Sequence, residues 1–277
     1  MDIIDGHTHI FPPEIVERRK TIALTDEGFS RIYGDLRATM VDHEGLLKYM
    51  ERERVLQAVA CGFPFEDKGL IELANNYILE CARADPRIIP MASINIRNRE
   101  TGIREAERCL GLGAKGIGEV ALYEVGLGRD ELKLLDEVAR LAAVAKVPLL
   151  LHLNEQVGHQ YSGKVAVDFG EVTKFVEAHQ DVTFVLAHLG GGLCFYEFMP
   201  EIRNAFTRVF YDTAALPYIY SIDTYRFIDA FLAKKTLFGS DYPLLSFKRY
   251  DGGIQHLREE GMAAVLSGNA RRVYLHG

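Results

Sequence analysis

Short apolar runs recur along the whole chain, and segments with helical spacing separate them. One such segment repeats apolar residues every three or four positions, at Leu70, Ala74, Tyr77, Ile78 and Cys81. The runs themselves are almost wholly apolar, which is typical of parallel strands covered on both faces. We expect eight strands, at residues 3–5, 56–62, 88–94, 115–119, 147–153, 182–188, 209–213 and 236–241. This alternation predicts an α/β fold, the (β/α)8 TIM barrel, with an open doubly wound sheet as the alternative.

The sequence contains no linker, internal repeat or low-complexity tract that would divide it. We therefore expect a single domain over residues 1–277, a length that fits one large barrel. Two connections are longer than a minimal loop, because residues 10–41 follow the first strand and residues 153–168 follow the fifth. In a barrel both would lie above the C-terminal mouth, where they could form a lid over a substrate.

Six side chains that could bind a metal or move a proton lie at the ends of five of these runs. They are His7 and His9 in the first run, Glu119 in the fourth, His152 in the fifth, His188 in the sixth and Asp241 in the eighth. The C-terminal ends of barrel strands are where active sites of such folds lie. Imidazoles and carboxylates together suit a divalent ion such as zinc. The sequence therefore predicts a catalytic metal site, with zinc as the expected ion and one ion favoured over two.

Composition and charge narrow the choice of partners. The formal net charge is -7, and no long run of Lys or Arg is present, so we do not expect nucleic acid as a partner. No signal peptide or membrane-spanning run is visible, which favours a cytoplasmic protein that does not bind membranes. Glycine-rich nucleotide motifs are missing as well. A small-molecule substrate is the expected partner, and the sequence is compatible with an oligomer.

Several motifs together resemble a known family. They are Ile4-Asp5-Gly6-His7-Thr8-His9-Ile10-Phe11-Pro12, Leu151-His152, Ala187-His188-Leu189-Gly190-Gly191, Phe238-Gly239-Ser240-Asp241-Tyr242-Pro243 and Gly268-Asn269-Ala270-Arg271-Arg272. With them the whole chain resembles the amidohydrolase superfamily, specifically the amidohydrolase-2 branch of TIM-barrel metal-dependent hydrolases.

The resemblance implies a role for each matching residue. His7, His9 and His152 would bind the metal, and Asp241 would be both a ligand and the proton shuttle. His188 would bind substrate, orient the attacking water or bind a second metal. The implied activity is hydrolysis of a small polar substrate, which can carry a carboxylate, through a metal-activated water. Asp241 would take a proton from that water and pass it to the leaving group.

Some assignments stay open at this point. Glu119 is similar to the glutamate that bridges two metals in TatD-type nucleases, but it could equally contact substrate or support a ligand. His159 and Lys164 in the loop at 153–168 are expected to contact substrate, and Lys164, Lys248 or Arg249 could hold a substrate carboxylate. The alternatives to a hydrolase are a nonoxidative metal-dependent decarboxylase of the same superfamily, a TatD-like nuclease, and a barrel that binds metal or ligand without catalysis.

Overall fold

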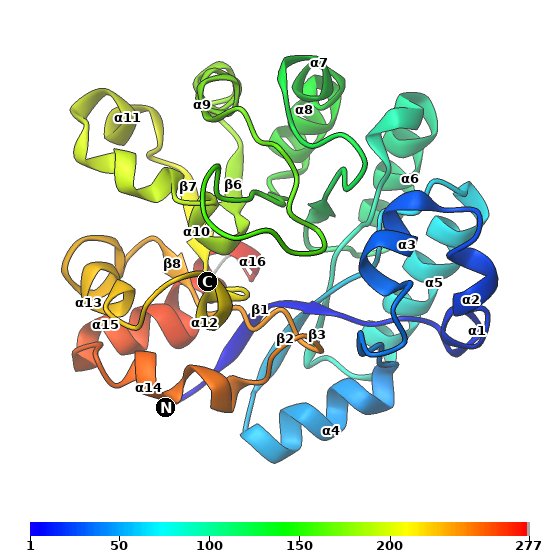
Figure 1. Cartoon of the computed structure of the whole chain (residues 1–277), viewed down its shortest axis with the longest axis horizontal. Helices are drawn as coiled ribbons and strands as arrows, with labels where there is room; N and C mark the ends of the chain where they lie inside the picture. Colours follow the sequence, from blue (N-terminus) through cyan, green and yellow to red (C-terminus); the bar gives the residue numbers. More distant parts are fainter. Residues whose placement is uncertain (276–277) are drawn as a thin grey trace.

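The computed structural model describes residues 1–275, and in this part of the chain eight parallel strands form a barrel (Figure 1). The predicted (β/α)8 TIM barrel is confirmed. The strands are β1 Ile4–His9, β2 Gln57–Cys61, β3 Ile88–Pro90, β4 Ile117–Val120, β5 Pro148–Leu151, β6 Thr183–Leu186, β7 Val209–Asp212 and β8 Thr236–Leu237.

Backbone hydrogen bonds close the barrel at two seams. Continuous pairing joins β1 to β3 and β4 to β8. Between β3 and β4, the amide of Ala92 donates to the carbonyl of Gly116 over 2.9 Å. Between β8 and β1, the amide of Gly6 donates to the carbonyl of Phe238 over 2.8 Å, and the amide of Asp241 donates to the carbonyl of His7 over 2.9 Å. The second seam brings the first and last metal-ligand candidates of the sequence side by side.

Helices surround the strands, as Figure 1 shows. The α-helices are α1 Pro13–Glu17, α2 Arg19–Ile22, α3 Glu27–Tyr33, α4 His43–Glu53, α5 Lys68–Ala84, α6 Arg99–Gly111, α7 Arg129–Leu134, α8 Asp136–Ala145, α9 Phe169–Ala178, α10 Ala187–Gly190, α11 Pro200–Ala205, α12 Leu216–Ile219, α13 Thr224–Phe227, α14 Asp251–Ile254, α15 Glu259–Ala263 and α16 Asn269–Tyr274. Short 3-10 or π segments are η1 Ile96–Asn98, η2 Leu193–Phe198, η3 Ile228–Leu232, η4 Phe247–Tyr250 and η5 Ala264–Gly268. Within residues 1–275 no helix is both long enough and apolar enough to span a membrane.

The strands bury side chains on both faces. Leu150 packs in the barrel interior with Ile4 and Val185, whereas Leu149 and Leu151 pack against the surrounding helices. Successive strand residues point to opposite faces, so the residue two positions after Leu150 again points inward. That residue is His152.

Several strand boundaries differ from the sequence prediction. The first strand continues to His9, and the third ends at Pro90. The sixth strand ends at Leu186 and the eighth at Leu237, earlier than expected. Soon after β6 the chain turns at His188, which has a left-handed φ of 58°. Asp241, four residues after the end of β8, also has a left-handed φ, of 60°. The long connection at 10–41 also contains helices α1, α2 and α3.

Candidate metal centre

Three of the predicted ligands form a first donor group at the C-terminal ends of β1 and β8. The Nε2 atoms of His7 and His9 lie 3.2 Å apart, and Asp241 Oδ1 lies 3.4 Å from His9 Nε2 and 3.9 Å from His7 Nε2. Tetrahedral coordination with bonds of about 2.0–2.1 Å places ligand atoms about 3.3–3.4 Å apart. The spacing of these three atoms therefore suits one divalent ion.

Glu119, His152 and His188 form a second donor group, at the ends of β4, β5 and β6. His152 Nδ1 lies 2.8 Å from Glu119 Oε1 and 3.2 Å from His188 Nε2. The distance from His188 Nε2 to Glu119 Oε1 is 4.0 Å. Each group of three could hold a metal ion by the separation of its ligand atoms.

The carboxylate of Glu119 lies between the two groups. Its Oε1 belongs to the second group, while its Oε2 lies 3.7 Å from the Nε2 atoms of both His7 and His9. The structure thus brings all six predicted residues together, and it places Glu119 where one carboxylate could serve two ions.

The donor chemistry also fits a divalent cation. His188 Nδ1 donates to the carbonyl oxygen of Ala214 over 2.8 Å, so His188 Nε2 is left with its lone pair facing the cluster. His152 Nε2 is buried without a hydrogen-bond partner among the described residues. The spacings that define the second donor group run to the other ring nitrogen, Nδ1, which lies 2.8 Å from Glu119 Oε1 and 3.2 Å from His188 Nε2.

Electrostatic coupling keeps the carboxylates of the site charged. Burial alone would raise the pKa of Asp241, but the hydrogen bond to His9 and the charges of His7, His9 and His188 lower it to about 2. The pKa of Glu119 is likewise well below its ordinary value, because His152 and His7 outweigh the effect of burial. Glu119 and Asp212 raise the pKa of His7 in turn, against its own burial. These ionised acids form a site that favours positive charge.

Asp212 is a buried acid of this site that the sequence analysis did not single out. It is the last residue of β7, and its Oδ2 accepts a hydrogen bond from His7 Nδ1 over 2.8 Å. Its Oδ1 accepts from the backbone amides of His188 and Ala214, over 2.9 and 3.0 Å. The sequence contains a signal for this site residue, because Asp212 is a polar residue directly after the apolar run Val209-Phe210-Tyr211.

The two residues predicted to contact substrate lie in the loop after β5, and Lys164 is occupied there by its own loop. Its Nζ donates to the carbonyls of Val157 and His159, over 2.7 and 3.1 Å, and lies 3.4 Å from the carboxylate of Glu155. The side chain of His159 is exposed, and its ring packs near Tyr161. The structure therefore does not bring either side chain into the donor groups.

That loop lies close to two other parts of the barrel mouth. At one end, an added Cβ on Gly191 would lie 2.3 Å from the carbonyl oxygen of Asn154. Further along, an added Cβ on Gly163 would lie 2.8 Å from a side-chain carbon of Ile32 in α3. The loop runs across the middle of the molecule in Figure 1, and its role as a lid stays a prediction.

Aromatic side chains border the second donor group. The ring of Tyr123 meets His152 edge-on at 5.2 Å, and Phe63 stacks on Tyr123 at 5.5 Å. Tyr33 from the loop after β1 packs against Phe63 at 5.8 Å. Burial together with the charges of Asp241 and Glu119 raises the pKa of Tyr33, which places this ring in the field of the donors. All three rings are themselves buried, so they form a packed aromatic cluster beside the second donor group.

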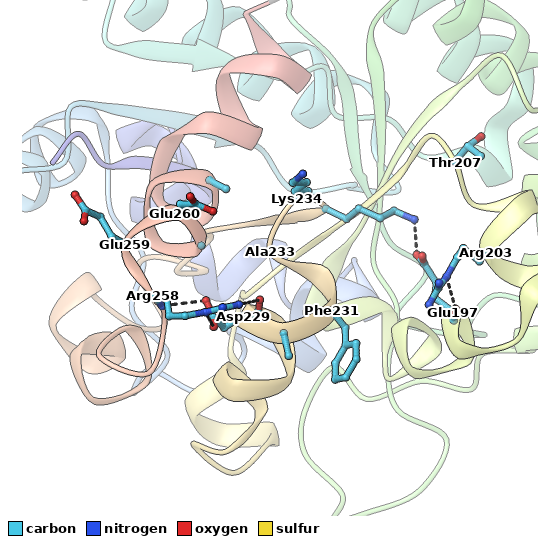
Figure 2. Close-up of a pocket in the computed structure, with 14 residues that line it drawn as sticks. Glu197, Arg203, Thr207, Asp229, Phe231, Ala233, Lys234, Arg258, Glu259 and Glu260 are labelled. Carbon is cyan, nitrogen blue, oxygen red and sulfur yellow. Dashed lines mark hydrogen bonds and ion pairs between the residues drawn. The ribbon is translucent and has the colours of Figure 1, made fainter.

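A large cavity of about 940 Å³ lies away from the donors (Figure 2). Its lining residues Lys235 and Thr207 precede β8 and β7, so it opens near the N-terminal ends of these strands. Four of the charged side chains that line the cavity pair with one another, in the ion pairs Lys235–Glu197 and Arg258–Asp229. Catalytic sites of barrels lie at the opposite end, and the cavity contains none of the six donors.

A closed parallel barrel with metal donors at its C-terminal rim defines a class of metal-dependent barrel proteins. A family model described as Amidohydrolase matches residues 4–275, and the chain belongs to this family. The predicted resemblance is thereby confirmed, and membership supports a metal-dependent enzyme. No curated protein sequence matches the chain significantly.

Solved structures share the fold over the full chain at low identity. The 5-carboxyvanillate decarboxylase from Sphingomonas paucimobilis matches with a TM-score of 0.79 at 16% identity, covering 99% of each chain. A 2,6-dihydroxybenzoate decarboxylase complexed with 2,6-dihydroxybenzoate matches with a TM-score of 0.70 at 17% identity, also covering 99% of each chain. The 5-carboxyvanillate decarboxylase from Novosphingobium aromaticivorans, complexed with manganese and a nitrobenzoic acid, matches with a TM-score of 0.77 at 15% identity, covering 99% of this chain and 96% of that one.

Proposed function

We propose that the protein is a metal-dependent decarboxylase that removes CO2 from a small aromatic carboxylic acid without a redox step. The observation that carries this proposal is the cluster of imidazoles and carboxylates at the C-terminal end of the barrel, which could hold a metal ion and through it bind the carboxylate of a substrate. An aromatic side chain borders this cluster, since Tyr123 contacts the ring of His152. The names of three solved structures with the same fold, all decarboxylases of benzoic acids, support this choice over hydrolysis.

The residues divide the proposed reaction between binding and proton transfer. A divalent ion held by the two donor groups would act as a Lewis acid on substrate oxygens. Loss of CO2 breaks the bond between the ring carbon and the carboxylate, and the electron pair left on that carbon must take up a proton. Asp241 is the carboxylate best placed to relay this proton, because its side chain is 18% exposed whereas that of Glu119 is 3% exposed. Since Asp241 is ionised at rest, it must first take up the proton from solvent or from a hydroxyl group of the substrate and then pass it to the ring carbon.

The donor atoms indicate a class of divalent metal ions and not one particular metal. Imidazole nitrogen favours zinc, whereas carboxylates also suit manganese, and one of the decarboxylases of the same fold is complexed with manganese. We propose a divalent ion of this class, and both Zn²⁺ and Mn²⁺ belong in the test.

Hydrolysis, the activity first expected from the sequence, is the second candidate. The specific observation in its favour is the position of Glu119, whose two oxygens face different donor groups. Two ions bridged in this way are common in hydrolytic sites, where they stabilise both the attacking and the leaving oxygen. The nuclease alternative has less support, because the net charge of -7 opposes binding of a phosphate backbone.

Product analysis separates the two candidates. Protein loaded with Mn²⁺ or Zn²⁺ is incubated in H2¹⁸O with hydroxylated benzoic acids, including 5-carboxyvanillate and 2,6-dihydroxybenzoate, and with aryl esters and lactones. Decarboxylation predicts release of CO2 in equal amount to an organic product that contains no ¹⁸O. An organic product that gains ¹⁸O would instead establish hydrolysis. Asp241→Asn should strongly slow turnover, whereas the control Asp223→Asn changes an exposed acid and should not.

A further inference from the structure

Asp212 links the two donor groups through a single buried carboxylate. Its Oδ2 accepts from His7 of the first group over 2.8 Å, and its Oδ1 accepts from the backbone of His188 in the second group over 2.9 Å. Resting on the metal site of the proposed function, we propose that Asp212 is a positioning residue that holds His7 and His188 in the arrangement in which both groups can bind metal.

The contact with His7 selects which ring nitrogen carries the hydrogen. A carboxylate oxygen accepts the hydrogen bond at this position, so His7 donates from Nδ1. In the neutral ring this leaves the lone pair on Nε2, the atom that lies 3.2 Å from His9 Nε2 and 3.7 Å from Glu119 Oε2. Metal-binding histidines commonly depend on such a carboxylate at their other nitrogen.

The contact with His188 supports an unusual backbone turn. His188 and Leu189 have φ of 58° and 54°, a left-handed conformation that residues with a side chain rarely adopt. Asp212 Oδ1 accepts the amide of His188, and the carbonyl of Ala214 accepts the ring Nδ1 of the same residue over 2.8 Å. The end of β7 thus holds both the backbone and the ring of His188.

Close packing around Asp212 is a further sign of this role. An added Cβ on Gly239 would lie 2.9 Å from the Cβ of His7 and 3.3 Å from the Cβ of Asp212. His7 and Asp212 therefore pack so closely against position 239, after β8, that only glycine fits there without a shift. β1, β7 and the segment after β8 therefore pack closely together at His7 and Asp212.

Asp212→Asn tests the proposal with little change of shape. The amide oxygen can still accept from His188 and Ala214, but the amide nitrogen would face His7 Nδ1 and force the hydrogen onto Nε2. We expect Mn²⁺ to bind about 10–100-fold more weakly, the usual effect of removing such a support. Binding is measured without substrate by titration with Mn²⁺, following the free ion by electron paramagnetic resonance.

Asp26→Asn is the matched control. Asp26 is also buried and also accepts two backbone amides, from Phe29 and Glu66, each over 2.8 Å, but it lies in the loop after β1. This variant should keep the Mn²⁺ affinity of the wild-type protein. An equal affinity in Asp212→Asn and wild type overturns the positioning role, whereas a wild-type protein that binds neither Mn²⁺ nor Zn²⁺ overturns the proposed function itself.

A second variant decides the question if Asp212→Asn does not fold. Gly239→Ala keeps the carboxylate but introduces a methyl group against His7 and Asp212. Folded Gly239→Ala protein with weakened Mn²⁺ binding supports the proposal. Folded protein with unchanged binding overturns it.

Discussion

Replacing Glu119 with Gln removes one charge from the centre of the donor cluster and keeps the side-chain shape. Glu119 Oε2 lies 3.7 Å from His7 Nε2 and from His9 Nε2. At that distance one unit of opposite charge contributes about 4 kcal/mol with an effective dielectric constant of about 20. This energy corresponds to roughly a thousandfold in a binding constant. The amide dipole and local relaxation offset a part of it, so we expect metal affinity to fall about 100- to 1000-fold.

Metal affinity and stoichiometry measure this effect directly. Glu119→Gln and wild-type protein are titrated with Mn²⁺ and Zn²⁺, and bound metal per chain is determined after dialysis at a fixed free concentration. The matched control is Glu197→Gln, since Glu197 is a buried acid that accepts from Tyr211 and Lys235 near the other cavity. We expect normal metal binding in that control. If Glu119→Gln binds the same number of ions with an affinity within threefold of wild type, the shared position of Glu119 has no electrostatic consequence and the reasoning is wrong.

Three further predictions concern proton transfer, the lid and acid stability. Asp241→Asn should lower kcat about 100- to 10,000-fold in steady-state assays while the melting temperature stays high, and an undiminished kcat would contradict the proton-delivery role. Lys164→Ala should speed limited proteolysis at 153–168 because the Nζ contact to Val157 is lost, whereas a large rise in KM for an acidic substrate would restore Lys164 as a substrate ligand. The pKa of Glu105 is lowered because its hydrogen bonds to Arg108, Asn75 and Cys109 outweigh burial. Its contribution to stability is therefore present above the ordinary pKa and lost as pH falls. Urea unfolding at several pH values should show the difference between wild type and Glu105→Gln shrinking below pH 4.5, and a constant difference would refute the shift.

The sequence was sufficient to predict the barrel and the meeting of six side chains at its rim. Strand periodicity placed His7 and His9 two positions apart near the end of one strand, and parallel strands of a barrel end on the same side. His152 follows the same rule, because it lies two residues after the inward-facing Leu150. These positions depend on the period of the backbone and on topology, which a pattern of apolar residues specifies well.

The remaining features depend on tertiary contacts that the pattern does not contain. His188 and Asp241 adopt left-handed backbone angles after their strands end, and the carboxylate that supports the turn at His188 comes from Asp212 on another strand. Lys164 was predicted to contact substrate because a cation in a loop above a barrel is available for that role. In the structure, backbone carbonyls of the same loop accept the hydrogen bonds of Lys164. Contacts of this kind do not depend on the spacing of apolar residues, so the sequence pattern does not predict them.

The number of ions and the type of reaction should agree with each other. Three acids, Glu119, Asp241 and Asp212, face the site, and its imidazoles are the cationic groups that lower the pKa of the first two. A divalent ion would displace those protons, so metal affinity should fall as pH falls. One bound ion would leave much of the acid charge uncompensated and oppose a second carboxylate on the substrate. Two ions sharing Glu119 would reverse the sign of the site and supply the arrangement used in hydrolysis. A protein that binds one ion and releases CO2, or two ions and gains solvent oxygen in its product, would be consistent, whereas a mixture of these outcomes would show that Glu119 does not determine the reaction.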